Sequence, residues 1–281
     1  MIHNPVKALW AQGKPAINGW LSIGNGFTAE IMASAGYDSV TADLQHGAFD
    51  YHAMLGMFQA MRASGVALLA RVPWLDAGAI MKALDAGAHG VICPMVNSRQ
   101  EAERLVSYVR YPPRGTRSFG PTRANFSAGP NYGEGADDAV ICLAMIETRQ
   151  AYERVEEIAA TPGLDGVYIG PADLTLGLTG RTYRTGFDRE EPEMVEALHR
   201  IRDAAHAAGI RACLHNGTAA YAAKAIGWGF DLVTVSNDVR LLAGAAEASV
   251  ADVRRRVGDA RNAANSAQAP DGTGGGGTGG Y

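Results

Sequence analysis

The sequence has few cysteines, few lysines and no long apolar run, and each shortage excludes a class of protein. Its 281 residues include three cysteines, which lie far apart in separate apolar runs without the spacing of a metal site. We therefore expect buried, reduced thiols and a cytoplasmic protein. No apolar stretch approaches the roughly 18 to 20 residues of a membrane span, and the N-terminus lacks the pattern of a signal peptide, so no membrane partner is expected.

Basic residues are also scarce, with a net charge of −4 and no dense run of lysine and arginine. A nucleic-acid partner is not expected, because it requires a basic stripe. A Schiff-base aldolase is disfavoured too, because that chemistry needs a desolvated lysine and none of the lysines follows a predicted strand. The sequence also lacks a G-x-S-x-G motif and a Walker loop.

Apolar residues are plentiful, and they occur in short runs that alternate with helical patterns. Hydrophobic residues make up 47% of the chain and charged residues 19%, which is enough apolar surface for a sizeable core. Runs of this length that are rich in Val, Ile, Leu and Ala are typical of parallel strands buried on both faces. The runs are residues 16–23, 39–44, 67–72, 90–96, 139–146, 166–169, 210–214 and 232–235.

Eight strand–helix pairs predict a (β/α)8 TIM barrel of the α/β class, with a doubly wound open sheet as the alternative. We assign residues 1–262 to this single domain. A Gly/Pro-rich insertion at residues 111–137 falls outside the repeat, and its arginines are expected to face another subunit. The Gly-rich segment 263–281 is expected to be a flexible tail.

Polar side chains follow several predicted strands at the edge where barrel enzymes place their chemistry. Glu147 and Asp173 end neighbouring strands five and six. Carboxylates on neighbouring strands are close enough to repel each other unless a proton or a cation lies between them. Their oxygens suit Mg²⁺, Mn²⁺ or a similar ion. The alternative is that each carboxylate caps the helix that follows it.

Arg71 and His46 are the other candidate functional residues from this pattern. Arg71 leaves a buried strand and needs an anionic partner, which is either a ligand or Asp43 on the adjacent strand. The two roles are compatible, because an acid that orients Arg71 helps it to face a substrate. His46 is a general base, a ligand or a hydrogen-bonding group at the strand end.

Seven segments, in this order, resemble the HpcH/HpaI aldolase family of metal-dependent pyruvate aldolases, typified by 4-hydroxy-2-oxoheptanedioate aldolase. The resemblance extends from about residue 5 to residue 260. It implies a barrel whose last helix is exchanged between subunits of a hexamer built as a trimer of dimers. The segments are GWLSIGN, DLQHG, ARVPW, ALDAGAHGVICPMV, RYPPRGTRSFG, AMIETRQA and GLDGVYIGPADLTLGL.

The resemblance also implies roles for individual residues. Asp85, which matches an aspartate paired with the histidine, falls near the end of a predicted helix and away from the strand ends. The implied roles are metal binding by Glu147 and Asp173, contact with the pyruvyl oxygen by Arg71, base function for His46 with Asp85, carboxylate binding at Gly170 and Ala172, and pocket lining by Trp20 and Leu214.

The implied reaction is the reversible cleavage of a 4-hydroxy-2-oxo acid to pyruvate and an aldehyde, as in the breakdown of aromatic compounds. A divalent cation (Mg²⁺, Mn²⁺ or Co²⁺) and Arg71 stabilise the enolate, and His46 moves the proton of the 4-hydroxyl by way of a bound water. Two alternatives remain: a citrate-lyase β-type or malyl-CoA-like lyase, and a non-catalytic barrel that binds oxoacids.

Overall fold

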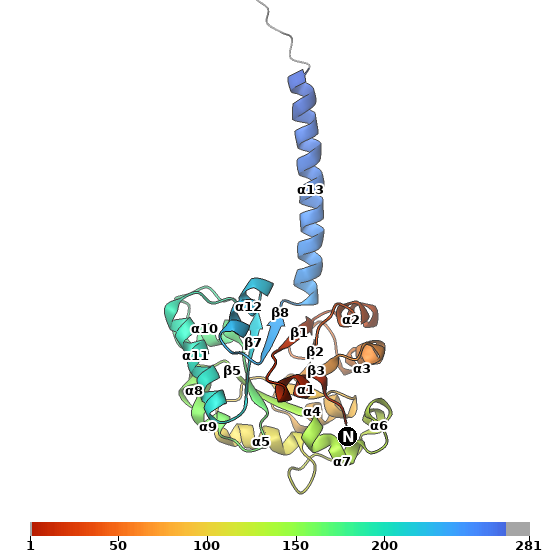
Figure 1. Cartoon of the computed structure of the whole chain (residues 1–281), viewed down its shortest axis with the longest axis vertical. Coiled ribbons are helices and arrows are strands. Elements are labelled where there is room, and N and C mark those ends of the chain that lie inside the picture. Colours follow the sequence, from red (N-terminus) through yellow and green to blue (C-terminus); the bar gives the residue numbers. More distant parts are fainter. Residues whose placement is uncertain (1, 268–281) are drawn as a thin grey trace, which may run out of the picture. The chain divides into compact units, whose positions relative to one another are not determined.

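The computed structural model describes residues 2–267, whose centre is a closed barrel of eight parallel strands in chain order (Figure 1). The strands are β1 (Ala16–Leu21), β2 (Ser39–Asp43), β3 (Ala67–Arg71), β4 (Gly90–Cys93), β5 (Ile141–Ile146), β6 (Gly166–Ile169), β7 (Arg211–Asn216) and β8 (Leu232–Val235). β8 pairs with β1 and closes the barrel. The predicted TIM barrel is confirmed, and the open sheet is excluded.

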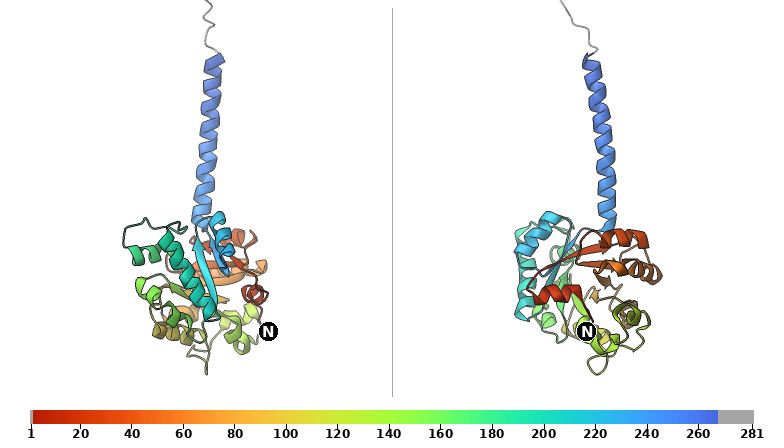
Figure 2. Two further views of the ribbon diagram at one scale, coloured as in Figure 1. Left: turned by 60° about the vertical axis from the view of Figure 1, so that its left-hand side comes forward. Right: turned by 45° about the vertical axis from the view of Figure 1, so that its right-hand side comes forward.

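Helices follow the strands, and those before residue 238 surround the barrel, as the two views in Figure 2 show. The helical segment that follows β5 is divided in two at Arg154. The helical segments are α1 (Pro5–Ala11), α2 (Gly26–Ala33), α3 (Tyr51–Ala60), η1 (Met61–Ser64), α4 (Ala77–Asp85), α5 (Arg99–Val109), α6 (Thr122–Ala128), α7 (Tyr132–Ala139), α8 (Arg149–Glu153), α9 (Val155–Ala159), α10 (Pro171–Thr179), α11 (Pro192–Ala207), α12 (Ala219–Gly227) and α13 (Asp238–Ala267).

The strands are apolar throughout because both of their faces are buried. Leu69, Leu143 and Tyr168 belong to a cluster inside the barrel. Ala70 and Ala144, the next residues along two of those strands, belong to the cluster between the barrel and the helices. Since successive side chains of a strand point to opposite faces, a shift of one residue decides whether a side chain lies inside the barrel or outside it.

Five strands end at residues other than those predicted: β1, β2 and β3 stop one or two residues early, and β4 and β7 differ in opposite directions. β4 stops at Cys93, because Pro94 lacks an N–H for the ladder and Met95 has a φ of 57°, which is not an extended conformation. β7 continues to Asn216, which pairs with Val235 of β8. Both differences lie at the carboxyl end of the barrel, where the strands turn into the functional loops.

The 111–137 insertion is partly helical, with α6 and most of α7, and its arginines have partners in the same chain. Arg114 pairs with Asp138 at 2.6 Å. Arg117 pairs with Asp85, also at 2.6 Å, and its side chain is fully buried. Arg123 donates to the carbonyl oxygen of Ala86. The insertion therefore packs against the carboxyl end of α4 within one chain.

The chain divides into two compact units between residues 239 and 240, and α13 supplies nearly all of the described part of the second. Val250, Val253 and Val257 of α13 are exposed at spacings that place them along one stripe. The predicted tail from residue 263 begins within α13, and residues 268–281 lie outside the described residues. Among residues 2–267, no helix is both long and apolar enough to cross a membrane.

Candidate active site

A cavity of about 400 Å³ lies at the carboxyl ends of the strands and brings together most of the predicted site residues. Six strands contribute their last residue or the residues just beyond it, as in other barrels of this type. Its lining consists of Trp20, Ser22, Asp43, His46, Arg71, Met145, Glu147, Gly170, Ala172, Asp173, Phe187, His215, Asn237 and Val239.

Asp43 and Arg71 form a bidentate ion pair on one side of this cavity. The register of β2 with β3 places the two residues opposite each other. Arg71 donates from Nε and Nη2 to the two oxygens of Asp43, at 2.8 and 2.6 Å. Burial disfavours the charged carboxylate, but the hydrogen bond and charge of Arg71 outweigh it and lower the pKa of Asp43. The predicted salt bridge is present, and Arg71 still lines the cavity.

Asp43 also orders the chain around it. Its Oδ1 accepts hydrogen bonds from the backbone N–H groups of Gln45 and His46, at 3.1 and 3.2 Å. Its Oδ2 accepts one from Nε1 of Trp20 at 3.2 Å, and the Arg71 guanidinium lies 4.9 Å from the centre of the Trp20 ring. One buried carboxylate therefore fixes the indole, the guanidinium and the backbone that carries the exposed His46 side chain.

Glu147 and Asp173 also line the cavity, and they follow two neighbouring strands, β5 and β6. Glu147 follows Ile146, which pairs with Ile169 of β6, and it is only 2% exposed. Burial raises the pKa of Glu147 to about 7, a hydrogen bond from the Met95 N–H opposes this, and the charge of Asp173 adds to it. The charge of Asp173 is therefore close enough to disfavour the ionisation of Glu147.

The structure does not support the alternative that these carboxylates are helix caps. Thr148 caps α8, because its side chain accepts the N–H of Ala151. Gly170 occupies the N-cap of α10, and Asp173 lies in the first turn of that helix. Glu147 is left with its side chain directed at the cavity rather than at a helix end.

The two carboxylates fit a hard divalent cation. Among residues 2–267 there is no group of three or more His, Cys, Asp and Glu side chains arranged for a metal. Mg²⁺ and Mn²⁺ do not require one, since they accept one or two carboxylates and take further oxygens from water and substrate. A Cβ added at Gly170 would lie 2.5 Å from Oε2 of Glu147, so glycine keeps the space beside that oxygen open. The donor set and this space suit such an ion.

The family resemblance implied that Leu214 lines the pocket, but His215 lies there instead. Leu214 is fully buried in the cluster between barrel and helices. His215, the next residue, lines the cavity, with its ring centre 4.8 Å from Trp20 and 4.5 Å from Phe187. Strand alternation would have found His215 from the sequence, because only one of two consecutive residues faces the barrel interior.

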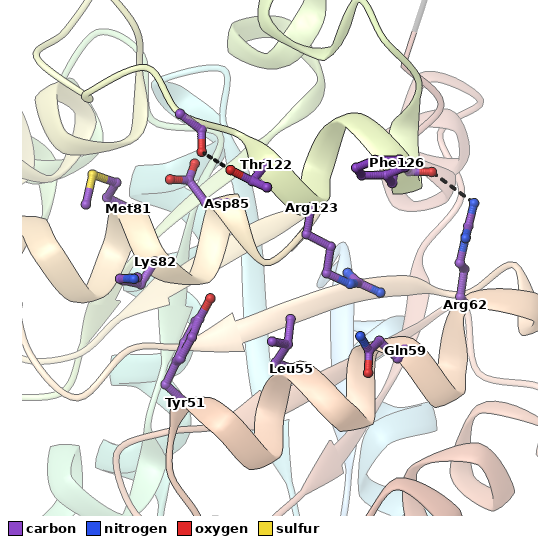
Figure 3. Close-up of a pocket in the computed structure, with 11 residues that line it drawn as sticks. Tyr51, Leu55, Gln59, Arg62, Met81, Lys82, Asp85, Thr122, Arg123 and Phe126 are labelled. Atoms are coloured by element: carbon purple, nitrogen blue, oxygen red, sulfur yellow. Dashed lines mark hydrogen bonds between the residues drawn. The ribbon is translucent and has the colours of Figure 1, made fainter.

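Asp85 lies away from the strand-end cavity. It lines a second pocket of about 690 Å³ between α3, α4 and α6 (Figure 3), together with Tyr51, Lys82 and Arg123. Burial raises the pKa of Asp85 despite the opposing hydrogen bond and charge of Arg117. The second pocket is the larger, but it lies outside the barrel and contains neither His46 nor the two metal-binding candidates. Within one chain, Asp85 and His46 therefore belong to different pockets.

The chain is similar to known proteins over most of its length. The family model for HpcH/HpaI aldolase/citrate lyase matches residues 18–241. A hydroxypyruvate/pyruvate aldolase of Rhizorhabdus wittichii is 42% identical, over 89% of this chain and 99% of that protein. A 4-hydroxy-2-oxo-heptane-1,7-dioate aldolase of Salmonella heidelberg is 34% identical, over 89% of this chain and 94% of that protein.

Solved structures agree with these similarities. The crystal structure of an HpcH/HpaI aldolase/citrate lyase family protein from Burkholderia cenocepacia superposes with a TM-score of 0.82 at 30% identity. The match covers 90% of this chain and 100% of that one.

Proposed function

The chain belongs to the HpcH/HpaI aldolase/citrate lyase family, and from this we propose that it is a metal-dependent carbon–carbon lyase that cleaves a 4-hydroxy-2-oxo acid to pyruvate and an aldehyde. The observation that carries this proposal is the shared cavity of Glu147, Asp173 and Arg71, in which two carboxylates face a guanidinium oriented by Asp43. The aldolase names of the relatives support the reaction class.

The first turn of α10 is the proposed site for the carboxylate of pyruvate. Gly170, Ala172 and Asp173 line the cavity, and Gly170 is the N-cap of that helix. The N–H groups of a first helical turn have no partner within the helix, so they favour an anion. This turn holds the 2-oxo acid with its keto group between the two carboxylates and Arg71.

Arg71 acts on the keto oxygen, where negative charge develops during cleavage. A divalent ion held by Glu147 and Asp173 (Mg²⁺, Mn²⁺ or Co²⁺) supplies positive charge there. The guanidinium donates to the same oxygen, and because Asp43 already fixes two of its donors it needs no reorganisation when charge forms.

His46 is the proposed base. Its side chain lines the cavity and is exposed to solvent. In cleavage it accepts the proton of the 4-hydroxyl. The C3–C4 bond then breaks, the aldehyde carbonyl forms, and the electron pair passes to the enolate of pyruvate. Protonation of the enolate at C3 completes the reaction.

The pairing of Asp85 with His46 requires a second copy of the chain, because the two residues lie in different pockets of one copy. We propose that it occurs between subunits of a hexamer, a trimer of dimers, in which α13 is exchanged. The exposed apolar stripe of α13 at Val250, Val253 and Val257 supports an exchanged helix, since it needs a covering surface.

The buried, unpaired cysteines support a cytoplasmic location.

A CoA-dependent lyase is less well supported by the same cavity. Among its described lining residues, Arg71 is the one arginine, it is already paired with Asp43, and no lysine is present. A CoA diphosphate would need basic groups that this cavity does not offer. A free 2-oxo acid fits its charges better.

Substrate screening tests the proposed function. Pyruvate or hydroxypyruvate is incubated with a panel of aldehydes, with Mg²⁺, Mn²⁺ or Co²⁺ and with chelator. The expected result is an aldol product with some aldehydes, formed only when a metal is present. Equal product in the chelated protein contradicts the metal assignment, and absence of product with every donor and metal contradicts the lyase.

A further inference from the structure

The turn after β4 contains a residue in an unfavourable backbone conformation. Met95 has a φ of 57°, and Ser236 after β8 is the other non-glycine residue with positive φ among the described residues. A residue with a Cβ rarely adopts this left-handed region, and such residues persist where the surroundings hold them. Both lie at the carboxyl end of the barrel, but only Met95 contacts a proposed metal-binding side chain.

The conformation of Met95 directs its N–H at Glu147. The donor lies 2.8 Å from Oε1 of the carboxylate. The other oxygen, Oε2, lies beside Gly170 at the start of α10, the helix that carries Asp173. A single backbone N–H therefore sets the rotation of a carboxylate that is almost fully buried.

Asn97 holds Met95 in place through both ends of its side-chain amide. Its Nδ2 donates to the Met95 carbonyl at 2.8 Å, and its Oδ1 accepts from Oγ1 of Thr148, the residue after Glu147. Its backbone N–H donates to Glu101 of α5 at 2.6 Å. Asn97 thus ties the turn after β4 to the end of β5, although it does not line the cavity.

We propose that Asn97 is a positioning residue for the metal-binding carboxylate. It locks Met95 in the left-handed conformation, and the Met95 N–H in turn orients Glu147 towards a divalent cation. This inference rests on the proposed function, in which Glu147 and Asp173 hold that cation. Partners that orient a metal ligand are typically worth roughly 10- to 100-fold in metal affinity.

Mn²⁺ binding to the full-length protein, measured by calorimetry or electron paramagnetic resonance, tests the inference independently of catalysis. Asn97→Ala should weaken Mn²⁺ binding by roughly 10- to 100-fold. Met95→Val should do the same with Asn97 intact, because a β-branched residue resists positive φ. Met95→Gly in the Asn97→Ala background should restore much of the affinity, because glycine adopts this φ freely. A purely structural role for Asn97 predicts no such rescue.

Ser236→Val is the matched control. It imposes the same backbone conflict at the same end of the barrel, but the Ser236 N–H donates to the carbonyl of Asn216 rather than to a carboxylate. Its Mn²⁺ affinity should stay near that of the wild type. An equal loss in Ser236→Val, or wild-type affinity in Met95→Val, overturns the inference.

A further variant separates this inference from the proposed function. If the wild type does not bind Mn²⁺, or if Glu147→Gln binds it equally well, the metal assignment fails and the inference fails with it. If Glu147→Gln loses Mn²⁺ while Asn97→Ala and Met95→Val keep it, the metal assignment stands and the positioning role alone is refuted.

Discussion

The two ends of the barrel have many polar groups, but those groups are satisfied in different ways. At the amino end, Asn4 donates to the carbonyl oxygens of His89 and Ala139, at 3.0 and 2.7 Å. Arg110 pairs with Asp165 at 2.8 Å. These bonds join residues just before β4, β5 and β6 to one another and to the helices. The charges of Arg110 and Asp165 are thus paired within the chain, although Nε of Arg110 is buried without a hydrogen-bond partner.

At the carboxyl end, one pair of side chains has opposite charges that neutralise each other, and another pair consists of two carboxylates. Asp43 and Arg71 satisfy each other in a bidentate pair. The charge of Asp173 instead disfavours the ionisation of Glu147, and the hydrogen bond that the structure gives Glu147 comes from the strained Met95. An arrangement that costs stability without a ligand is typical of a functional site.

Charge alone does not identify a functional site, since both ends of the barrel have charged groups. What distinguishes them is whether the groups balance within the chain. Substitutions at the carboxyl end should therefore reduce activity, whereas substitutions at the amino end should reduce stability.

The largest expected effect is that of Asp173→Ala, which removes an exposed carboxylate from the cavity. Activity should fall to the level of the chelated wild type, because one carboxylate alone holds a divalent ion poorly. The melting temperature should change little. Activity assays over a range of Mg²⁺ and Mn²⁺ concentrations, with thermal unfolding alongside, measure both. Wild-type activity at ordinary metal levels would show that Asp173 is not a ligand.

Arg71→Ala should reduce both aldol cleavage and exchange of the pyruvate methyl protons by on the order of 10²- to 10³-fold, the usual effect of losing one preorganised donor to an oxyanion. Arg71→Lys should be impaired as well, because an ammonium cannot form the same bidentate pair with Asp43. His46→Ala is the contrast, since it should impair cleavage more than exchange. Equal effects of Arg71→Ala and His46→Ala on exchange contradict these separate roles.

Asp165→Ala is the amino-end counterpart of Asp173→Ala, because Asp165 lies just before β6 and Asp173 just after it. The change leaves Arg110, whose side chain is 3% exposed, without its carboxylate. Breaking such a pair costs about 3 kcal/mol in the free energy of unfolding. Denaturant unfolding should show this loss, while kcat of the folded enzyme stays near wild type. A large fall in kcat in Asp165→Ala would show that the amino end also contributes to catalysis, contrary to the expectation.

Near neutral pH, the smallest expected effect is the pH dependence of stability contributed by His89. Burial, and then the charges of His3 and Arg123, lower the pKa of His89 from 6.5 to about 4. As the pH is lowered, the unfolded chain therefore binds this proton before the folded chain does. The free energy of unfolding is unaffected by His89 above pH 6.5 and falls as the pH drops from 6.5 towards 4. His89 Nδ1 accepts the Leu68 N–H, and His89→Asn keeps an acceptor without the titration. Its unfolding free energy should depend less on pH in that window.

The fold was largely predictable from the sequence, because strands buried on both faces form continuous apolar runs that helical patterns separate. The end of β4 was predicted less well. The run from Gly90 to Val96 is apolar throughout, and this pattern did not show that the strand ends within it, before Pro94 and the left-handed Met95.

The site was predictable where position along a strand decides it, as for Arg71, Glu147 and the turn at Gly170. It was less predictable where the face of a strand or the packing of a loop decides it. Leu214 and His215 differ only in the direction of their side chains. Phe187 reaches the cavity from a loop before α11, and its apolar character gave no signal of that position.

The most direct test of the account is deuterium exchange of the pyruvate methyl group in the full-length protein, followed by NMR. Exchange needs no aldehyde, so it isolates the chemistry assigned to Glu147, Asp173 and Arg71. We expect exchange that requires a divalent ion, stops with chelator and is lost in Asp173→Ala, while Asp165→Ala exchanges like the wild type. Metal-independent exchange, or equal loss in Asp165→Ala, would contradict it.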